Sequence, residues 1–259
     1  MDSTDRMEHE AIDWLRTNLE GIHSLVCFSG GKDSIVTEHL MKLSGLSYST
    51  NSTLTGIDPP EVTRFIRDNY PLCSFVRPHQ SFWHLLTTAN PPGGTGRGIK
   101  WCCTKIKENP SRSIPIYDRV LGIRAEESPS RAKYGRVRHC REKLDLTSPL
   151  TGEVQCYPIF HWKEWQIWEF IEKHKLPYPK LYDEGFDRIG CVICPNHHNH
   201  HGPYRDRWPN HFKCFEKYCK IWWNKRVGQG KDMWYDTVEE FIEHWYKGEF
   251  YYYKPTTPM

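Results

Sequence analysis

The feature that most constrains the fold is an apolar run that ends in a glycine turn and continues into a helical pattern. The run covers residues 25–28, the turn residues 29–31 and the helical pattern residues 33–43. A strand, a turn and a helix in this order direct backbone N–H groups and the positive helix end at one point, where an anion is stabilised. The sequence therefore predicts an α/β fold with an anion site after its first strand.

The residues of this turn are of the types that a phosphate needs. Two glycines let the backbone approach closely, a lysine adds a charge, two serines add hydroxyl donors, and an aspartate can hold Mg²⁺. They are Ser29, Gly30, Gly31, Lys32, Asp33 and Ser34. Their spacing differs from the G-x-x-x-x-G-K-[ST] phosphate loop, so a different phosphate loop is indicated. An ordinary strand–helix connection is the alternative.

Helical and strand patterns alternate along most of the remaining chain. Helices are expected over 7–20, 33–43, 62–66, 81–88 and 165–174, and strands over 25–28, 46–54, 72–76, 115–123 and 154–160. This alternation implies right-handed crossovers and a five-stranded, mainly parallel sheet with helices on both faces. The basic run at 130–143 is expected to be a solvated face or loop, or a clamp for an anionic substrate if it lies beside the phosphate turn.

The alternation stops beyond Cys194, so we expect one domain over 1–195 and a helical extension over 196–259. Residues 195–231 hold eight Lys or Arg against two acidic residues, with seven aromatic residues among them. Cations and rings together suit a groove for single-stranded nucleic acid. Rings at this spacing equally suit a packed helix face, so both interpretations stay open.

The ten cysteines, without an N-terminal hydrophobic signal, indicate a reducing, cytoplasmic compartment and favour metal binding over disulfides. No apolar run is long enough to span a membrane, so a soluble protein is expected. Cys102-Cys103 and the Cys191-x-x-Cys194 motif offer two thiolate pairs. Because adjacent thiolates fit a single tetrahedral ion poorly, a [4Fe-4S] cluster is favoured over zinc. Unligated thiols are the remaining alternative.

Together, these motifs resemble the adenylyl-sulfate and phosphoadenylyl-sulfate reductase family of the pyrophosphatase-loop superfamily, over residues 25–195. The resemblance implies an adenine-nucleotide α-hydrolase-like fold that binds ATP or a sulfonucleotide. It assigns a phosphate loop to 29–34 and a second nucleotide-side loop to Thr55-Gly56. It also assigns a substrate-facing motif that contains Gly122, Arg124 and Arg131.

The resemblance also implies roles for individual residues. Cluster-bearing members hold four iron ions through residues that match Cys102, Cys103, Cys191 and Cys194. The residues expected to act in catalysis are Lys32, Asp33, Arg124 and Arg131. The assimilatory reductases carry a nucleophilic cysteine in a C-terminal Glu-Cys-Gly segment, whereas no cysteine follows Cys219 in this sequence.

The favoured function is therefore an ATP-dependent adenylylating enzyme with an iron–sulfur cluster that transfers sulfur to a nucleic acid, either DNA or tRNA, bound through 195–231. A sulfur-donor protein is an expected partner. One alternative is a sulfonucleotide reductase whose thiol comes from Cys214, Cys219 or a partner protein. The other is a non-catalytic, nucleotide-binding iron–sulfur module of a larger assembly.

Overall fold

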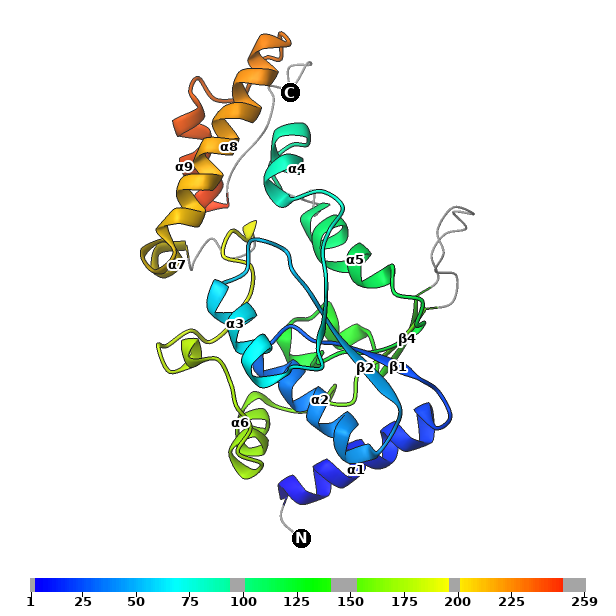
Figure 1. Cartoon of the computed structure of the whole chain (residues 1–259). Helices are drawn as coiled ribbons and strands as arrows, with labels where there is room; N and C mark the ends of the chain where they lie inside the picture. Colours follow the sequence, from blue (N-terminus) through cyan, green and yellow to red (C-terminus); the bar gives the residue numbers. More distant parts are fainter. Residues whose placement is uncertain (1–2, 94–100, 141–152, 196–200, 249–259) are drawn as a thin grey trace. The chain divides into compact units, whose positions relative to one another are not determined.

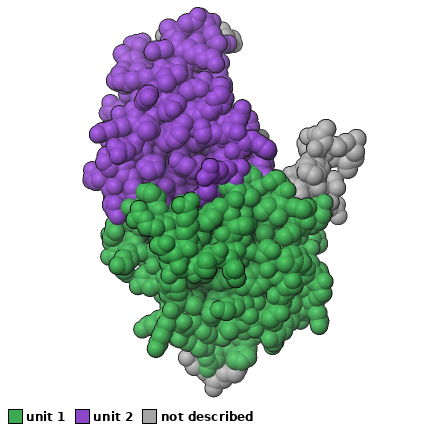
Figure 2. Space-filling view, viewed as in Figure 1, with its two compact units in different colours: residues 1–53, 60–76, 110–189 green, residues 54–59, 77–109, 190–259 purple. Residues whose placement is uncertain are grey.

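The computed structural model describes residues 3–93, 101–140, 153–195 and 201–248, which belong to two compact units. Unit 1 comprises residues 1–53, 60–76 and 110–189, and unit 2 comprises residues 54–59, 77–109 and 190–259 (green and purple in Figure 2). The expected domain boundary after residue 195 stays a prediction. The compact units divide the chain differently, because unit 2 also includes residues 54–59 and 77–109.

Unit 1 contains a six-stranded sheet with the order β3-β2-β1-β4-β6-β5. Figure 1 labels three of its strands, β1, β2 and β4. The strands are β1 (Ser24–Cys27), β2 (Tyr48–Thr53), β3 (Ser74–Val76), β4 (Asp118–Val120), β5 (Val137–Cys140) and β6 (Glu153–Cys156). All pairs are parallel except β5 with β6, which is antiparallel. The predicted α/β fold with a mainly parallel sheet is confirmed.

The number of strands differs from the prediction, because the sheet has six strands in the described part of the chain and five were expected. The additional strand is β5, which lies in the basic run at 130–143. Its two central residues, Arg138 and His139, are exposed. An edge strand that carries polar and charged side chains is protected from further pairing, but it lacks the apolar pattern by which strands are recognised.

Three helices cover one face of this sheet: α1 (Ser3–Leu19), α2 (Lys32–Ser44) and α6 (Glu164–Lys173). They share one apolar core with Val26, Val120 and Cys156, which pair in register across β1, β4 and β6. The helices contribute fully or almost fully buried residues to it, among them Leu15, Leu40 and Phe170. The periodic apolar residues at these positions thus form helices because each helix buries one face against the sheet.

The opposite face of the sheet is polar around β4. Arg119 and Glu153 are each only 2% exposed there, and the Arg119 Nε atom lies 3.5 Å from Glu153 Oε2. Arg112, at the end of α5 (Asn109–Arg112), places its Nε atom 3.3 Å from the same oxygen. Helices therefore lie on both faces, and this face contains a buried ion network.

The remaining elements are shorter or belong to unit 2. Unit 1 adds α3 (Pro60–Asn69) and the 3₁₀ turns η2 (Ala125–Glu127), η3 (Arg131–Lys133) and η4 (Lys180–Tyr182). Unit 2 contains α4 (Phe82–Thr88), the π-helix η1 (Cys102–Glu108), α7 (His201–Arg207), α8 (Pro209–Gly228) and α9 (Val238–Lys247). No helix in the described ranges is both long and apolar enough to cross a bilayer.

The aromatic residues of unit 2 form its core. Phe215 of α8 lies 4.1 Å from Trp245 of α9 between ring centroids, and Trp222 lies 5.2 Å from Phe241. Other rings of 201–222 are also buried, namely those of Tyr204, Trp208 and Phe212. The interpretation of these rings as base-stacking surfaces is therefore wrong, and the packed-face alternative is confirmed for them.

Candidate functional site

The phosphate turn lies between β1 and α2, as predicted, and its conformation requires glycine. Gly30 has a φ of +75°, and a Cβ atom there would lie 2.9 Å from Val62 of α3. The Ser29 hydroxyl donates to the Ser34 hydroxyl over 3.2 Å, and the Ser34 hydroxyl donates to the carbonyl of Gly31 over 2.8 Å. Both serines therefore hold the shape of the turn.

The turn lies at the topological switch point of the sheet. From β1 the chain crosses to β2 on one side and later returns to β4 on the other side of β1. In open α/β sheets, ligands bind at such a point, beyond the carboxyl ends of the strands. The loop after β4 comes so close to α2 that a Cβ atom on Gly122 would lie 2.6 Å from the backbone carbonyl of Asp33. Gly122 thus lies beside the phosphate turn, and its expected place in a substrate-facing motif stays a prediction.

Arg124 connects the loop after β4 to the first turn of α2. Its guanidinium is 3% exposed, donates to Asp33 Oδ1 over 2.5 Å from Nε, and pairs with Glu126. Burial raises the pKa of Asp33, and the positive charge of Arg124 opposes this rise. Asp33, the expected Mg²⁺ ligand, is therefore engaged with Arg124 in this structure.

Lys32 is 5% exposed, and its ammonium has partners from later parts of the chain. The Nζ atom lies 3.2 Å from Glu164 Oε1 and donates to the carbonyl oxygen of Asp187 over 3.0 Å. Glu164 Oε2 also lies 4.0 Å from Nη2 of Arg124, so one half-exposed carboxylate bridges both cations. Lys32, Asp33 and Arg124, all predicted from the sequence, thus belong to one network.

Arg131 is tied to the network less directly. Its guanidinium pairs with Glu127, four residues earlier, and its backbone N–H donates to the Ser128 hydroxyl over 3.2 Å. Glu127 also accepts a hydrogen bond from the backbone N–H of Arg124, over 3.0 Å. Arg131 therefore stabilises the loop that carries Arg124, and its expected contact with substrate stays a prediction.

The predicted second loop, Thr55-Gly56, belongs to unit 2. The Thr55 hydroxyl donates to Asp58 Oδ2 over 2.5 Å and accepts from the backbone N–H of Ile57 over 3.2 Å. Gly56 has a φ of +75°, which explains the need for glycine in this turn. A nucleotide-binding role for these two residues stays a prediction.

The four cysteines of the predicted cluster all lie in unit 2. Cys102 and Cys103 begin η1, while Cys191 and Cys194 lie on either side of Val192 and Ile193. The backbone N–H of Val192 donates to the Ile57 carbonyl over 2.7 Å. A hydrogen bond with Cys103, burial, and the negative charges of Cys191 and Cys194 together raise the pKa of the Cys102 thiol. The four thiols therefore share one electrostatic environment.

The four thiols are the set for which the sequence predicts an iron–sulfur cluster. Among the residues that the structure describes, no group of three His, Cys, Asp or Glu side chains is arranged to hold one metal ion. Cysteine thiolates are the ligands that iron–sulfur clusters take in proteins. The negative charge of Cys191 also raises the pKa of Lys107, so a cation lies beside the thiolates. The cluster itself stays a prediction.

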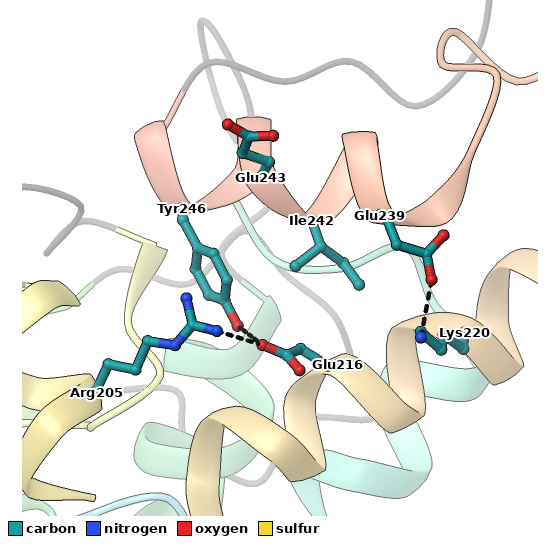
Figure 3. A pocket seen from close by; sticks show the side chains of 7 residues that line it. All are labelled: Arg205, Glu216, Lys220, Glu239, Ile242, Glu243 and Tyr246. Atoms are coloured by element: carbon teal, nitrogen blue, oxygen red, sulfur yellow. Dashed lines mark hydrogen bonds and ion pairs between the residues drawn. The ribbon is translucent and has the colours of Figure 1, made fainter. Parts of the chain in front are cut away.

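A shallow pocket in unit 2 contains none of the predicted site residues (Figure 3). It is lined by Arg205, Glu216, Lys220, Glu239, Ile242, Glu243 and Tyr246. Glu216 Oε1 accepts from Arg205 over 3.2 Å and from the Tyr246 hydroxyl over 3.0 Å, and Lys220 pairs with Glu239 over 2.8 Å (Figure 3). Glu243, the third acidic residue of the lining, pairs with Lys247 over 3.0 Å, so each charge of the pocket has an opposite charge beside it.

Sequence reasoning missed Glu164, Tyr182 and Asp187. Glu164 begins α6, and the other two lie in the segment that follows α6. The Tyr182 hydroxyl accepts a hydrogen bond of 2.9 Å from the backbone N–H of Lys32. No local pattern marks these residues, because the fold alone brings a segment some 150 positions away to the phosphate turn. The acidic residue in the first turn of α6, Glu164, suits the positive end of that helix, but this position does not predict its contact with Lys32.

The sequence matches the phosphoadenosine phosphosulfate reductase domain over residues 23–197. The uncharacterized protein MJ0066 of Methanocaldococcus jannaschii is 32% identical over 203 residues, 74% of this chain and 40% of that protein. An adenosine 5'-phosphosulfate reductase of Shouchella clausii is 35% identical over 85 residues, 32% of each chain. The crystal structure of yeast FAD synthetase with FAD has a TM-score of 0.50 at 16% identity, covering 74% of this chain and 66% of that one. The chain thus spans less than half of these two sequence relatives.

Proposed function

Since the chain belongs to the phosphoadenosine phosphosulfate reductase domain family, as its match over residues 23–197 shows, we propose that its phosphate turn binds the phosphates of ATP. The observation that carries this proposal is the bridge made by Glu164. This carboxylate lies 3.2 Å from Lys32 and 4.0 Å from Arg124, so an anion can contact both cations at the switch point of the sheet. A phosphate that replaces the half-exposed carboxylate would retain both charges as partners.

The proposed reaction is the transfer of AMP to an acceptor oxygen. The oxygen attacks the α phosphorus, the bond to the β phosphate breaks, and pyrophosphate leaves with the bonding electrons. Lys32 and the N–H groups at the start of α2 would stabilise the charge on pyrophosphate, while Arg124 would hold the α phosphate. Asp33 is the proposed ligand of Mg²⁺, which would neutralise the same leaving group.

Sulfur transfer would complete the cycle. A hydrosulfide attacks the atom that carries the adenylylated oxygen, a base carbon or a backbone phosphorus, the bond to that oxygen breaks, AMP leaves with the bonding electrons, and the S–H proton is lost to solvent. We propose that Cys102, Cys103, Cys191 and Cys194 hold an iron–sulfur cluster, which would supply a binding site for the incoming sulfide. The charge of Cys191 raises the pKa of Lys107, which keeps Lys107 protonated. Its positive charge would then offset the negative charge of the thiolates.

The proposed acceptor is a nucleic acid, for which α8 offers a row of exposed cations. Lys213, Lys217 and Lys225 are exposed, whereas Lys220 and Arg205 pair with Glu239 and Glu216. Phosphate backbones are bound by such exposed cations without regard to sequence. Because most rings of α8 are buried, the proposed contacts are electrostatic.

A sulfonucleotide reductase is the second candidate, and the similarity to the reductase of Shouchella clausii favours it. A thiolate would attack the sulfur of the sulfonucleotide, and the nucleotide phosphate would leave. Burial raises the pKa of Cys219 well above its usual value and the side chain is 0% exposed, so Cys219 is unsuited to this role. Cys214, which is exposed, or a partner's thiol would have to serve. A non-catalytic iron–sulfur module is the remaining alternative.

The test is the release of pyrophosphate and AMP from ATP in the presence of DNA, tRNA and a sulfide source. Lys32→Gln shortens the side chain by one atom and keeps a hydrogen-bond donor but removes the charge, and it should lower the rate about 100-fold. Lys42→Gln alters an exposed lysine of the same helix and should leave the rate unchanged. A rate that is the same in both variants would contradict the proposal. Sulfite production from a sulfonucleotide and an added thiol would favour the reductase.

A further inference from the structure

The phosphate turn is occupied by a segment of the same unit. The Tyr182 hydroxyl accepts a 2.9 Å hydrogen bond from the backbone N–H of Lys32, the first residue of α2. The same oxygen lies 3.4 Å from where a Cβ atom of Gly31 would be. The carbonyl oxygen of Asp187 accepts from the Lys32 ammonium over 3.0 Å. Residues 178–187, here called the strap, thus place two oxygens on the groups that a phosphate would use.

The strap is held mainly by contacts that do not involve the turn. The Tyr182 ring packs edge-on against Trp168 of α6, with 5.0 Å between centroids, and Leu181 is only 1% exposed. Asp183 donates its backbone N–H to the Lys180 carbonyl over 2.9 Å, which closes the turn η4. Removal of the Tyr182 hydroxyl alone therefore leaves the packing of the strap in place.

The contact of the strap with the Lys32 amide excludes a phosphate contact, while its contact with the Lys32 ammonium occupies one of three donors. A backbone N–H group has one proton, so the Lys32 amide cannot donate well to Tyr182 and to a phosphate oxygen together. The first amides of a helix have no partner within the helix, which is why they bind anions, and here an aromatic hydroxyl satisfies one of them. The Lys32 ammonium also lies over the ring of Tyr182, 5.3 Å from its centroid, so the same tyrosine contacts both the amide and the ammonium of Lys32.

We propose that the strap is an autoinhibitory element, in which the Tyr182 hydroxyl takes the place of a phosphate oxygen and must leave before a nucleotide binds. This inference rests on the proposed function of the phosphate turn. Nucleotide binding is then an exchange of partners at Lys32. Only molecules in which the strap has left Lys32 can bind nucleotide, so the apparent affinity for nucleotide falls as the engaged fraction rises. The strap selects ligands that can replace both of its oxygens, so a polyphosphate should displace it better than a monophosphate.

The test compares Tyr182→Phe with a matched control, Tyr178→Phe, in the full chain. The Tyr178 ring also packs edge-on against Trp168, at 5.3 Å, but its hydroxyl donates to Asp183. Calorimetric titration with ATP should show Tyr182→Phe binding about 3- to 10-fold more tightly than the unmodified chain, the range expected for one hydrogen bond. Tyr178→Phe should bind as the unmodified chain does. In the nucleotide-free protein, the Lys32 amide should exchange its hydrogen faster in Tyr182→Phe.

The outcomes separate this inference from the function on which it rests. If the unmodified chain binds ATP and Tyr182→Phe binds equally or more weakly, the strap is not inhibitory, while the proposed ATP site stands. If neither protein binds ATP or a sulfonucleotide, the proposed function fails and the inference fails with it. Tighter binding together with faster exchange of the Lys32 amide supports both.

Discussion

At the scale of single residues, the candidate site depends on glycines that allow backbone segments to meet. Gly30 lets the phosphate turn pack on α3, and Gly122 lets the loop after β4 touch the backbone of Asp33. The close approach at Gly122 lies two residues before Arg124, which pairs with Asp33. The glycines therefore position charged groups although they carry no side chain themselves.

Gly122→Ala should separate the two loops of the site. The new Cβ would lie 2.6 Å from the carbonyl carbon and oxygen of Asp33 and 2.9 Å from the Ser34 nitrogen, and backbone atoms cannot move aside cheaply. We expect a loss of about 1–3 kcal/mol in the free energy of unfolding, measured by denaturant titration. Gly228→Ala is the control, because nothing lies within 4 Å of its Cβ position. Equal stability of both variants would contradict this geometry.

At the scale of elements, periodic apolar residues and turn residues were sufficient to predict most helices and strands. The helix that starts at Lys32 ends at Ser44 and is capped by Gly45, which has a φ of 73°, within one residue of the expected range 33–43. The edge strand β5 was missed because its polar residues follow no apolar period. The strap was missed because its contacts with Lys32 are made between segments far apart in the chain, and local patterns carry no information on such pairs.

The aromatic contact between α8 and α9 should contribute stability to unit 2. Phe215 is 0% exposed and its ring lies 4.1 Å from that of Trp245, so Phe215→Ala should lower the free energy of unfolding by about 3–5 kcal/mol. Ile221→Ala, on the same helix but 43% exposed, should cost about 1 kcal/mol or less. Denaturant titration monitored by tryptophan fluorescence measures both. A small effect of Phe215→Ala would indicate that its ring is not a core residue.

The two cysteine segments should bind about four iron ions when the protein is purified without oxygen, because paired thiolates suit a cubane cluster. The protein should then be brown, and Cys194→Ser should lose both colour and iron. Cys73→Ser is the control, since Cys73 is buried next to β3 and is not part of the thiol group. Iron content and visible absorption are the measurements. Stoichiometric zinc in a colourless anaerobic preparation would contradict the cluster.

At the scale of the whole molecule, the sequence predicted the fold class. It also singled out Lys32, Asp33 and Arg124, which the fold brings together, while their role in binding phosphate stays a prediction. The partners of these residues could not be predicted, since Glu164 and Tyr182 reach the turn only through the order of the strands and the packing of α6. The function of the basic helix α8 depends on which cations remain unpaired after folding. The ion pair between Lys220 and Glu239 illustrates why composition alone overestimates the charge available to a nucleic acid.

If a single-stranded nucleic acid binds through α8, its affinity should depend on salt. Contacts with four phosphates correspond to a slope of about −3 in log affinity against log salt. Reversing Lys213 and Lys217 to Glu should flatten this slope by about 1 to 1.5 and weaken binding to all sequences alike, because each lost phosphate contact removes about 0.7. Reversing Lys42 and Lys175, exposed lysines of unit 1, changes the net charge equally and is the control. Equal slopes in the two double variants, measured by fluorescence anisotropy, would exclude α8 as the binding surface.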